Sequence, residues 1–423
     1  MGTRPCQHSD DDYRHGIVAR KIGECKTHML PEQAKSILSN MLHPVDYNDF
    51  FDKIIERQPL VIRGDNNPAR LNIIGPDPRD TILNSYEQFA PYLTCHALAP
   101  TWPKPHARHV ESKQAFLQLL AEYHEREYTV RIPDVTGLSE KLQLFTRALE
   151  VIVENPVDVV IFWSLTDAKA PIHLDRHDIF CIQLVGEKKW FLSKDQAALP
   201  NPWKSAGEGP PPFDAYDTVT VKPGDLIYLP RGTAHTVHSQ SESIHLSIGF
   251  SPVTVREGLI ALIDYLSDQE RSLRAGLFTR ADNAHSQDSS GHLISRLGEA
   301  IDLLRQNFGS DGFVEAAMHQ RKSRMIQGLN KLTKAEPVSN LTPSSRLRQK
   351  PLSIINVVKT DHNLDISQPN ETILIHPGAE VAVNFITNTV EFSISEIPGD
   401  LETDVIQLLV SRFLTSGLLE VID

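Results

Sequence analysis

The feature that most constrains the fold is a strand-like segment, residues 178–185 (Asp-Ile-Phe-Cys-Ile-Gln-Leu-Val), whose apolar side chains occupy odd and even positions alike. Successive side chains of a strand point to opposite faces of a sheet, so the pattern predicts a strand that is buried on both faces. Gly186 follows directly and indicates a turn. Residues 187–192 (Glu-Lys-Lys-Trp-Phe-Leu) are then expected to form a hairpin with this strand.

A second stretch of the chain has the same strand-and-turn character. Residues 218–229 hold two short strand-like runs joined by Pro-Gly-Asp at 223–225, a sequence that favours a tight turn. Pro-Arg-Gly at 230–232 marks a further bend that presents His235 at a strand entry, and residues 243–250 close the stretch. We expect these antiparallel strands to fold into a small barrel.

Three potential metal ligands lie at the edges of these strands. His173 and Asp175 stand two residues apart just before the first strand, so on an extended segment both side chains leave the same face. The barrel can bring His235 against them. Two imidazoles and one carboxylate form the facial set that holds a non-haem Fe(II) while leaving positions open for a co-substrate and oxygen. A His-x-Asp pair alone is common at solvated strand ends, so the prediction depends on the whole set.

The whole pattern resembles the JmjC and cupin-type Fe(II) and 2-oxoglutarate oxygenases, and within them the ribosomal oxygenase group. That group has His-x-Asp, an apolar strand, Gly-x-Lys or Gly-x-Arg with an aromatic, then Gly-Asp-x-x-Tyr-x-Pro-x-Gly-x-x-His. This chain has His173-Leu174-Asp175, Gly186-Glu187-Lys188-Lys189-Trp190 and Gly224-Asp225-Leu226-Ile227-Tyr228-Leu229-Pro230-Arg231-Gly232-Thr233-Ala234-His235. Residues 41–63 also resemble the opening of the group, so the resemblance extends from about residue 38 to the C-terminus.

The resemblance implies a fold and a reaction. The fold is mixed α+β, a double-stranded β-helix (jelly-roll or cupin) barrel with helical decorations. Fe(II) is held by His173, Asp175 and His235, and Lys188 falls on the basic residue that pairs with the far carboxylate of 2-oxoglutarate. A buried carboxylate needs such a cation, and Lys189, the competing candidate, faces the other way on a strand. Decarboxylation of the co-substrate to succinate and carbon dioxide is coupled to hydroxylation of a nearby C–H bond.

Other pocket positions are less well defined by the sequence. Ser247 matches a family position where a hydroxyl helps to hold the co-substrate, although an ordinary strand serine fits equally well. The segment 159–171 is shorter than the usual loop there and lacks an asparagine that often contacts the co-substrate, so Ser164 or Thr166 is expected to replace it. Trp163 and Trp190 either line the pocket or belong to the core.

The chain divides into five regions. They are an N-terminal tail (1–30), a JmjC/cupin catalytic domain (31–252), a helical dimerisation domain (253–333), a linker (334–350) and a winged-helix-like C-terminal domain (351–423). Within the catalytic domain, residues 111–127 and 139–154 have helical spacing, and the proline-rich residues 200–213 predict a loop near the mouth of the site.

The last two domains are assigned mainly by resemblance. Three apolar helices after Thr254 need a neighbour to bury against, and the corresponding region of ribosomal oxygenases is the dimer interface, so we expect a homodimer; a self-contained bundle is the alternative. At the C-terminal end, strands are expected at 352–358, 371–376, 380–386 and 389–394, followed by a helix at 401–416 ended by Gly417. Winged helices often bind DNA, but the acidic residues here favour a structural or protein-recruiting role.

Composition sets the outer limits. The net charge of −12 (42 basic against 54 acidic residues) argues against direct nucleic-acid binding and favours a basic partner. No apolar run is long enough for a signal peptide or a membrane span, and Cys6, Cys25, Cys95 and Cys181 are too few for a disulfide framework, so we expect a cytoplasmic protein. Cys6 with His8 and Cys25 with His28 do not have the spacing of a standard zinc finger.

These observations predict an Fe(II)- and 2-oxoglutarate-dependent hydroxylase of a protein side chain. The resemblance makes a ribosomal protein the favoured substrate. Two alternatives stay open: a hydroxylase that tailors a small peptide or natural product, and a non-catalytic cupin-like binding protein with a vestigial metal site.

Overall fold

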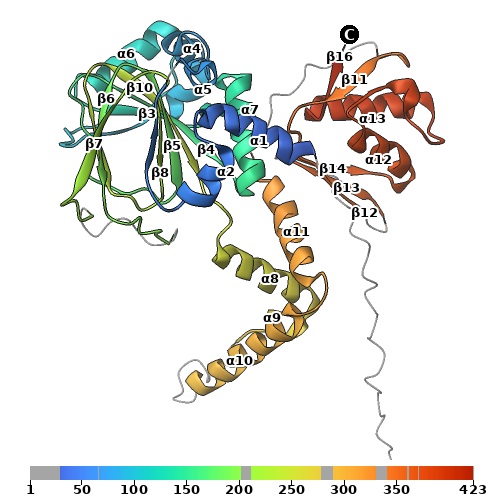
Figure 1. Ribbon diagram of the computed structural model, residues 1–423. Helices are drawn as coiled ribbons and strands as arrows, with labels where there is room; N and C mark the ends of the chain where they lie inside the picture. Colours follow the sequence, from blue (N-terminus) through green and yellow to red (C-terminus); the bar gives the residue numbers. More distant parts are fainter. Residues whose placement is uncertain are drawn as a thin grey trace, which may run out of the picture.

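The computed structural model describes residues 29–64, 66–201, 211–277, 289–329, 341–359, 362–369 and 371–422 (Figure 1). Residues 1–28 of the predicted tail, with Cys6, His8, Cys25 and His28, lie outside the described residues, as does most of the proline-rich loop at 200–213.

Two antiparallel sheets form the barrel. The larger sheet has the order β1-β8-β5-β10-β4-β3-β2, and the smaller has the order β7-β6-β9. The strands of the larger sheet are β1 (Leu60–Ile62), β2 (Thr94–His96), β3 (Thr129–Ile132), β4 (Asp158–Ser164), β5 (Asp178–Val185), β8 (Leu226–Leu229) and β10 (Ser243–Phe250). Those of the smaller are β6 (Lys188–Ser193), β7 (Tyr216–Val221) and β9 (His235–Ser239). The expected small antiparallel barrel is confirmed.

Two pairs of consecutive strands, β5 with β6 and β7 with β8, do not pair as the turns between them suggest. The expected hairpin of β5 with residues 187–192 is wrong, because β6 pairs with β7 and β9 in the other sheet while β5 pairs with β8 and β10. Gly186 has a φ of +68°, and a Cβ there would lie 2.0 Å from the carbonyl oxygen of Glu242. The tight turn at Gly186 therefore carries the chain from one sheet to the other. The turn at 223–225 does the same between β7 and β8.

The strand β5 is buried on both faces, as its sequence predicts. Phe180 and Ile182 pack into the main core with residues of α1 and α7, whereas Ile179 and Cys181 face the barrel interior beside Trp190. One face of the larger sheet thus packs against a layer of helices, and the other face lines the interior of the barrel (Figure 1).

Helices cover the outer face of the larger sheet. The two expected segments are confirmed as α6 (Lys113–His124) and α7 (Glu140–Val153), the latter capped by the Ser139 side chain. The helix α1 (Met29–Leu42) packs against α7. Short helical segments complete the layer: α2 (Tyr47–Asp49), η1 (Phe50–Ile54), α3 (Pro68–Leu71), α4 (Pro78–Asn84), α5 (Tyr86–Phe89), η2 (Ala90–Tyr92) and η3 (Val135–Leu138).

A helical region extends away from the barrel (Figure 1). It comprises α8 (Val255–Gln269), α9 (Arg271–Arg274), α10 (Ser289–Phe308) and α11 (Phe313–Ile326). Thr254 and Glu257 form a reciprocal capping box that starts α8, so the switch from strand to helix is encoded locally. Among the described residues, no helix combines the length and apolar character that a membrane span requires.

The C-terminal module contains two small antiparallel sheets and two longer helices. The sheets are β15-β11-β16 and β12-β13-β14. Their strands are β11 (Arg346–Gln349), β12 (Asn356–Lys359), β13 (Leu364–Gln368), β14 (Glu371–Ile375), β15 (Glu391–Ser393) and β16 (Leu419–Ile422). The helices are α12 (Glu380–Asn388) and α13 (Thr403–Ser416), with the single turns η5 (Pro377–Ala379) and η6 (Ile394–Glu396). Gly417 ends α13 in the left-handed conformation, as expected.

Two sequence-based expectations are corrected in this module. Residues 380–386 form the helix α12 rather than a strand, because Ala382, Val383 and Ile386 all reach the module core from one helical face. Residues 346–349, assigned to the linker, form β11, the central strand between β15 and β16. This strand has the sequence Arg-Leu-Arg-Gln, and only Leu347 is buried. Because the other three side chains are polar, the sequence alone is typical of a loop.

Candidate active site

The three proposed ligands come from two loops that are tied together by backbone hydrogen bonds. His173 and Asp175 lie before β5, and His235 begins β9. The His173 N–H donates to the His235 carbonyl at 3.0 Å, and the His235 N–H returns the bond at 2.8 Å. The Gly232 N–H donates to the Asp175 carbonyl at 2.8 Å. The sequence predicted that His173 and Asp175 lie on one extended strand, but they do not share a regular strand. Of the two residues, only His173 forms a β-bridge, a single antiparallel one to His235.

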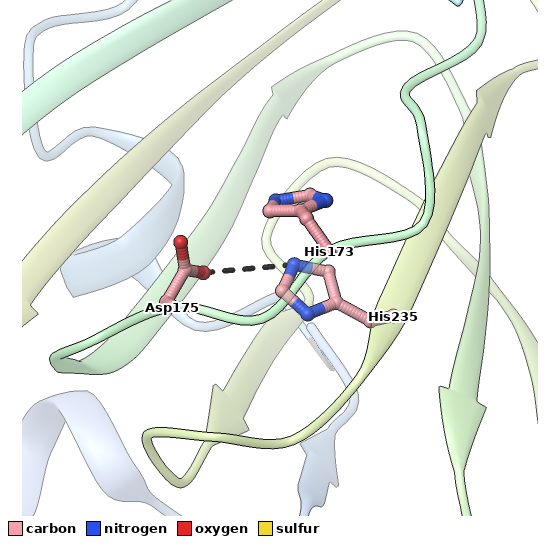
Figure 2. A group of neighbouring side chains, drawn as sticks. All are labelled: His173, Asp175 and His235. Carbon is pink, nitrogen blue, oxygen red and sulfur yellow. Dashed lines mark ion pairs between the residues drawn. The ribbon is translucent and has the colours of Figure 1, made fainter. Parts of the chain in front are cut away.

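The side chains of His173, Asp175 and His235 converge (Figure 2). One ligand-type atom of each lies within 4.8 Å of the other two. The His235 Nε2 is 3.6 Å from the Asp175 carboxylate, and the two imidazole centroids are 4.3 Å apart. This spacing fits three ligands around one small cation.

Hydrogen bonds on the far side of each ring select the nitrogen that faces the site. The Nδ1 of His173 lies 2.9 Å from the Pro171 carbonyl oxygen, and the Nδ1 of His235 lies 3.0 Å from that of Thr233. Each Nδ1 must carry a hydrogen to donate to a carbonyl, so each Nε2 keeps a free lone pair. Burial also lowers the pKa of His235, which favours the neutral form that binds metals.

The chemistry of this donor set fits a divalent iron. Two imidazole nitrogens and one carboxylate, all on one side, are the facial arrangement of non-haem Fe(II) oxygenases, and they leave the opposite side open. Among the described residues, this is the one group of histidines, cysteines and acids close enough to hold a metal ion.

A pocket with about 520 Å³ of empty space, partly open to solvent, extends from the triad between the two sheets. Side chains from both sheets line it: His96, Thr129, Phe162, Ser164, Ala168, Ala170, His173, Asp175, Ile179, Cys181, Lys188, Trp190, His235, Val237, Ser239, His245 and Ser247.

Lys188 supplies a buried cation to this pocket. Its side chain is 1% exposed, and its Nζ lies 3.1 Å from the Ser164 Oγ and 2.8 Å from the His245 Nδ1. Burial lowers the pKa of Lys188 to about 7, because removal from water penalises the ammonium form. Lys189 points to the outer face, where its Nζ lies 5.4 Å from the centre of the Phe191 ring. The structure thus separates the two lysines as their alternation on a strand predicts.

The structure brings both predicted serines into the pocket. Ser164 is buried and its hydroxyl lies 3.0 Å from that of Thr129, whereas Ser247 contacts the Cys181 thiol. Thr166, the alternative to Ser164, is not among the described residues that line the pocket.

The two tryptophans have different positions. Trp190 lines the pocket and stacks on His235 with a centroid distance of 5.7 Å. Trp163 belongs to the main core, and its Nε1 donates to Glu242 at 2.9 Å.

The polar pocket residues that sequence reasoning missed include His96, Thr129, Ser239 and His245. His245 had a usable signal, since it stands two residues before Ser247 on β10 and therefore shares its face. His96 and Thr129 lie on β2 and β3, which no motif links to the site. Burial, together with nearby positive groups, lowers the pKa of His96 to about 4, so this imidazole is neutral near pH 7.

Comparison with known proteins finds similarity to a described family over part of the barrel. A family model described as "JmjC domain" matches residues 141–257. The chain is 20% identical over 367 residues to "Ribosomal oxygenase 2" of Rattus norvegicus, covering 82% of this chain and 77% of that protein. It is 26% identical over 156 residues to "Ribosomal protein uL16 3-hydroxylase" of Escherichia coli, covering 35% of this chain and 40% of that protein.

A solved structure shows the same fold over most of the chain. YcfD, a ribosomal oxygenase from Escherichia coli solved in complex with cobalt and 2-oxoglutarate, superposes with a TM-score of 0.51 at 16% sequence identity. The superposition covers 90% of this chain and 99% of that one. The comparisons confirm the resemblance to JmjC oxygenases of the ribosomal oxygenase group and the JmjC/cupin fold. For "Ribosomal oxygenase 2" of Bos taurus, the matched region covers 48% of that protein.

Proposed function

We propose that this chain, which carries a JmjC domain, is an Fe(II)- and 2-oxoglutarate-dependent oxygenase that hydroxylates an amino-acid side chain of a protein. One observation supports this most: a metal-binding triad and a buried lysine line one pocket. 2-Oxoglutarate has a keto acid at one end and a second carboxylate at the other, so it needs a metal ion for the first and a buried cation for the second.

His173, Asp175 and His235 would hold the iron. When bound, iron supplies the redox chemistry that couples decarboxylation of the co-substrate to hydroxylation of a C–H bond. The protein orients its ligands through the carbonyls of Pro171 and Thr233, which keep each Nε2 directed at the metal.

Lys188 pairs with the far carboxylate of 2-oxoglutarate in this proposal. Ser164 holds the ammonium from one side, and Ser247 offers a hydroxyl to the co-substrate from β10. The apolar groups of the pocket, such as Ile179 and Val237, exclude water from the reacting atoms.

A ribosomal protein is the favoured substrate. The support is the similarity to "Ribosomal oxygenase 2" and to "Ribosomal protein uL16 3-hydroxylase". The net charge of −12 is also suited to a basic protein partner.

Iron-dependent release of succinate from 2-oxoglutarate tests the activity. His173→Ala should abolish it, whereas His177→Ala, which removes an exposed histidine four residues away, should leave it unchanged. Intact-mass analysis of ribosomal proteins from cells with and without this chain tests the target. A wild-type protein that neither takes up metal nor releases succinate with any candidate substrate refutes the enzyme assignment, and the absence of any one-oxygen mass difference refutes the ribosomal target.

We further propose that the chain is a homodimer through its helical region. Large apolar side chains four residues apart are exposed on α8, at Val255, Leu259 and Ile263. A second exposed row on α10 consists of Ile294, Leu297, Ile301 and Phe308. Such rows on neighbouring helices favour burial against a partner.

We propose that the chain is cytoplasmic. We also propose that its C-terminal module is winged-helix-like and recruits protein rather than nucleic acid. The acidic residues Glu371, Glu380, Glu391, Glu396, Asp400, Glu402 and Asp404 support protein recruitment, because acidic surfaces repel phosphate backbones. A gel-shift titration with duplex DNA tests whether the module avoids nucleic acid. Salt-sensitive retardation of the duplex contradicts the proposal.

A further inference from the structure

A buried histidine that belongs to neither the metal triad nor the predicted co-substrate contacts lies against the pocket lysine. His245 is 5% exposed on β10, and its Nδ1 is 2.8 Å from the Lys188 Nζ. The strand position explains the placement, because His245 and Ser247 share the face of β10 that lines the pocket.

The hydrogen-bonding capacity of an ammonium defines what this contact does. A protonated lysine has three N–H donors and no acceptor. Lys188 directs one donor to the Ser164 Oγ at 3.1 Å, so the contact at 2.8 Å to His245 takes a second. One donor is left for a ligand in the pocket.

The imidazole must accept in this contact when Lys188 is charged. The hydrogen of His245 then resides on Nε2, and the ring is neutral. Burial, together with the positive charge of Lys188, lowers the pKa of His245 well below its usual value, in agreement with a neutral acceptor.

Aromatic side chains hold the ring in this orientation. The His245 imidazole stacks on Phe162 with centroids 5.1 Å apart and an interplanar angle of 17°. Trp190 packs edge-on against it at 5.8 Å. On the other side of the lysine, Ser164 is held by the Thr129 hydroxyl at 3.0 Å. Both acceptors of Lys188 are therefore fixed before any ligand binds.

We propose that His245 is a positioning residue for Lys188: its Nδ1 accepts one N–H of the ammonium and thereby directs the remaining N–H at the far carboxylate of the co-substrate. The inference rests on the proposed 2-oxoglutarate dependence and adds how the pocket selects a keto acid with a second carboxylate. A keto acid without that carboxylate gains nothing from the arrangement.

Two variants separate positioning from packing. His245→Leu keeps a buried side chain between Phe162 and Trp190 but removes the acceptor. His245→Asn retains a side-chain oxygen near the position of Nδ1. His124→Leu serves as the control, because His124 is also largely buried, on α6, but contacts the Trp163 carbonyl outside the pocket lining.

The test is calorimetric titration of the full chain, loaded with Mn(II) in the absence of oxygen, with 2-oxoglutarate and with 2-oxovalerate, which lacks the second carboxylate. His245→Leu should weaken 2-oxoglutarate binding by about tenfold or more, the range of one hydrogen bond to a charged group, and leave 2-oxovalerate binding unchanged. His245→Asn should restore most of the affinity, and His124→Leu should bind both ligands like the wild type. In turnover, the KM for 2-oxoglutarate should rise in His245→Leu while kcat at saturation stays near that of the wild type.

The outcomes are distinguishable. A wild-type chain that does not bind 2-oxoglutarate refutes the proposed function and this inference with it. A wild-type chain that binds while His245→Leu binds equally well overturns the inference alone. Equal weakening of both ligands in His245→Leu also overturns it, because that result indicates a general packing role.

Discussion

Lys188 illustrates how one buried residue connects sequence to ligand chemistry. Its position two residues after Gly186 on a strand directs it into the barrel, and the barrel removes it from water. An amine in this environment holds its charge only when an anion or a strong acceptor is close. The free energy cost of its burial is thus offset most when a carboxylate occupies the pocket.

The pH dependence of co-substrate binding follows from the lowered pKa of Lys188, about 7. The ammonium form dominates below that pH and is lost above it, whereas His245 stays neutral because its pKa is far lower. We expect 2-oxoglutarate affinity to fall with rising pH between about 7 and about 9, by at most about tenfold per pH unit. Calorimetric titration across this range measures it.

Lys188→Arg is the matched variant for this prediction. A guanidinium stays charged throughout the range, so the pH dependence should flatten even if the absolute affinity changes. A wild-type affinity that does not vary over the same range contradicts the assignment of Lys188 as the titrating partner.

At the scale of elements, the turn at Gly186 determines whether β5 and β6 can lie in different sheets. Gly186→Ala should destabilise the fold by about 2 kcal/mol or more, because a left-handed φ and a close backbone contact both oppose a Cβ. Gly137→Ala, at a position with nothing near the added Cβ, should change stability by less than about 0.5 kcal/mol. Chemical denaturation of both variants measures the difference, and equal effects contradict this role for the turn.

A buried network joins the two loops that carry the ligands. Asp178 is fully buried, accepts from the Tyr228 hydroxyl at 2.5 Å and from Arg231 at 2.9 Å, and lies three residues after Asp175. Arg231 stands four residues before His235 and also pairs with Glu56. This network fixes the distance between the ligand loops before metal binds.

Asp178→Asn should therefore weaken metal binding as well as stability. We expect a loss of Mn(II) affinity of about 10-fold, because residues that orient metal ligands commonly have effects of this size. The control is Arg70→Lys, which alters a fully buried arginine outside this network. Arg70 donates to the carbonyls of Gly224, Met41, His43, Arg63 and Gly64 rather than to a ligand loop. That variant should lose stability but retain Mn(II) affinity. If both variants bind Mn(II) like the wild type, the network has only a structural role.

At the scale of the whole molecule, the helical region leaves its apolar side chains exposed in a single chain. The double variant Leu297→Glu with Ile301→Glu should convert a dimer to a monomer, because two charges in an apolar interface are costly to bury. Leu408→Glu, at a similarly exposed leucine of α13, should leave the assembly unchanged. Sedimentation equilibrium decides between the states, and a wild-type chain that is monomeric at micromolar concentration contradicts the dimer.

Much of the fold was predictable wherever the physics is local. The burial of β5 on both faces, the capped helix after Ser139 and the end of α13 at Gly417 each follow from side-chain alternation or helix capping within a few residues. The triad was also predictable, because its residue types and their place at strand ends are visible in the sequence. The alternation of Lys188 and Lys189 settled which lysine enters the barrel.

The tertiary structure alone decided what depends on partners far apart in the chain. Strong turns at Gly186 and 223–225 predict a change of direction, but not that the next strand joins the opposite sheet. Whether residues 380–386 form a helix or a strand depended on the surface they bury against. The role of His245 arises only where β10 meets β6, since an isolated strand histidine has no lysine beside it. The sequence by itself therefore determined the elements whose signals are local and the three residues of the triad, whereas sheet pairing, the elements of the C-terminal module that were misassigned and the Lys188 end of the pocket depended on long-range packing.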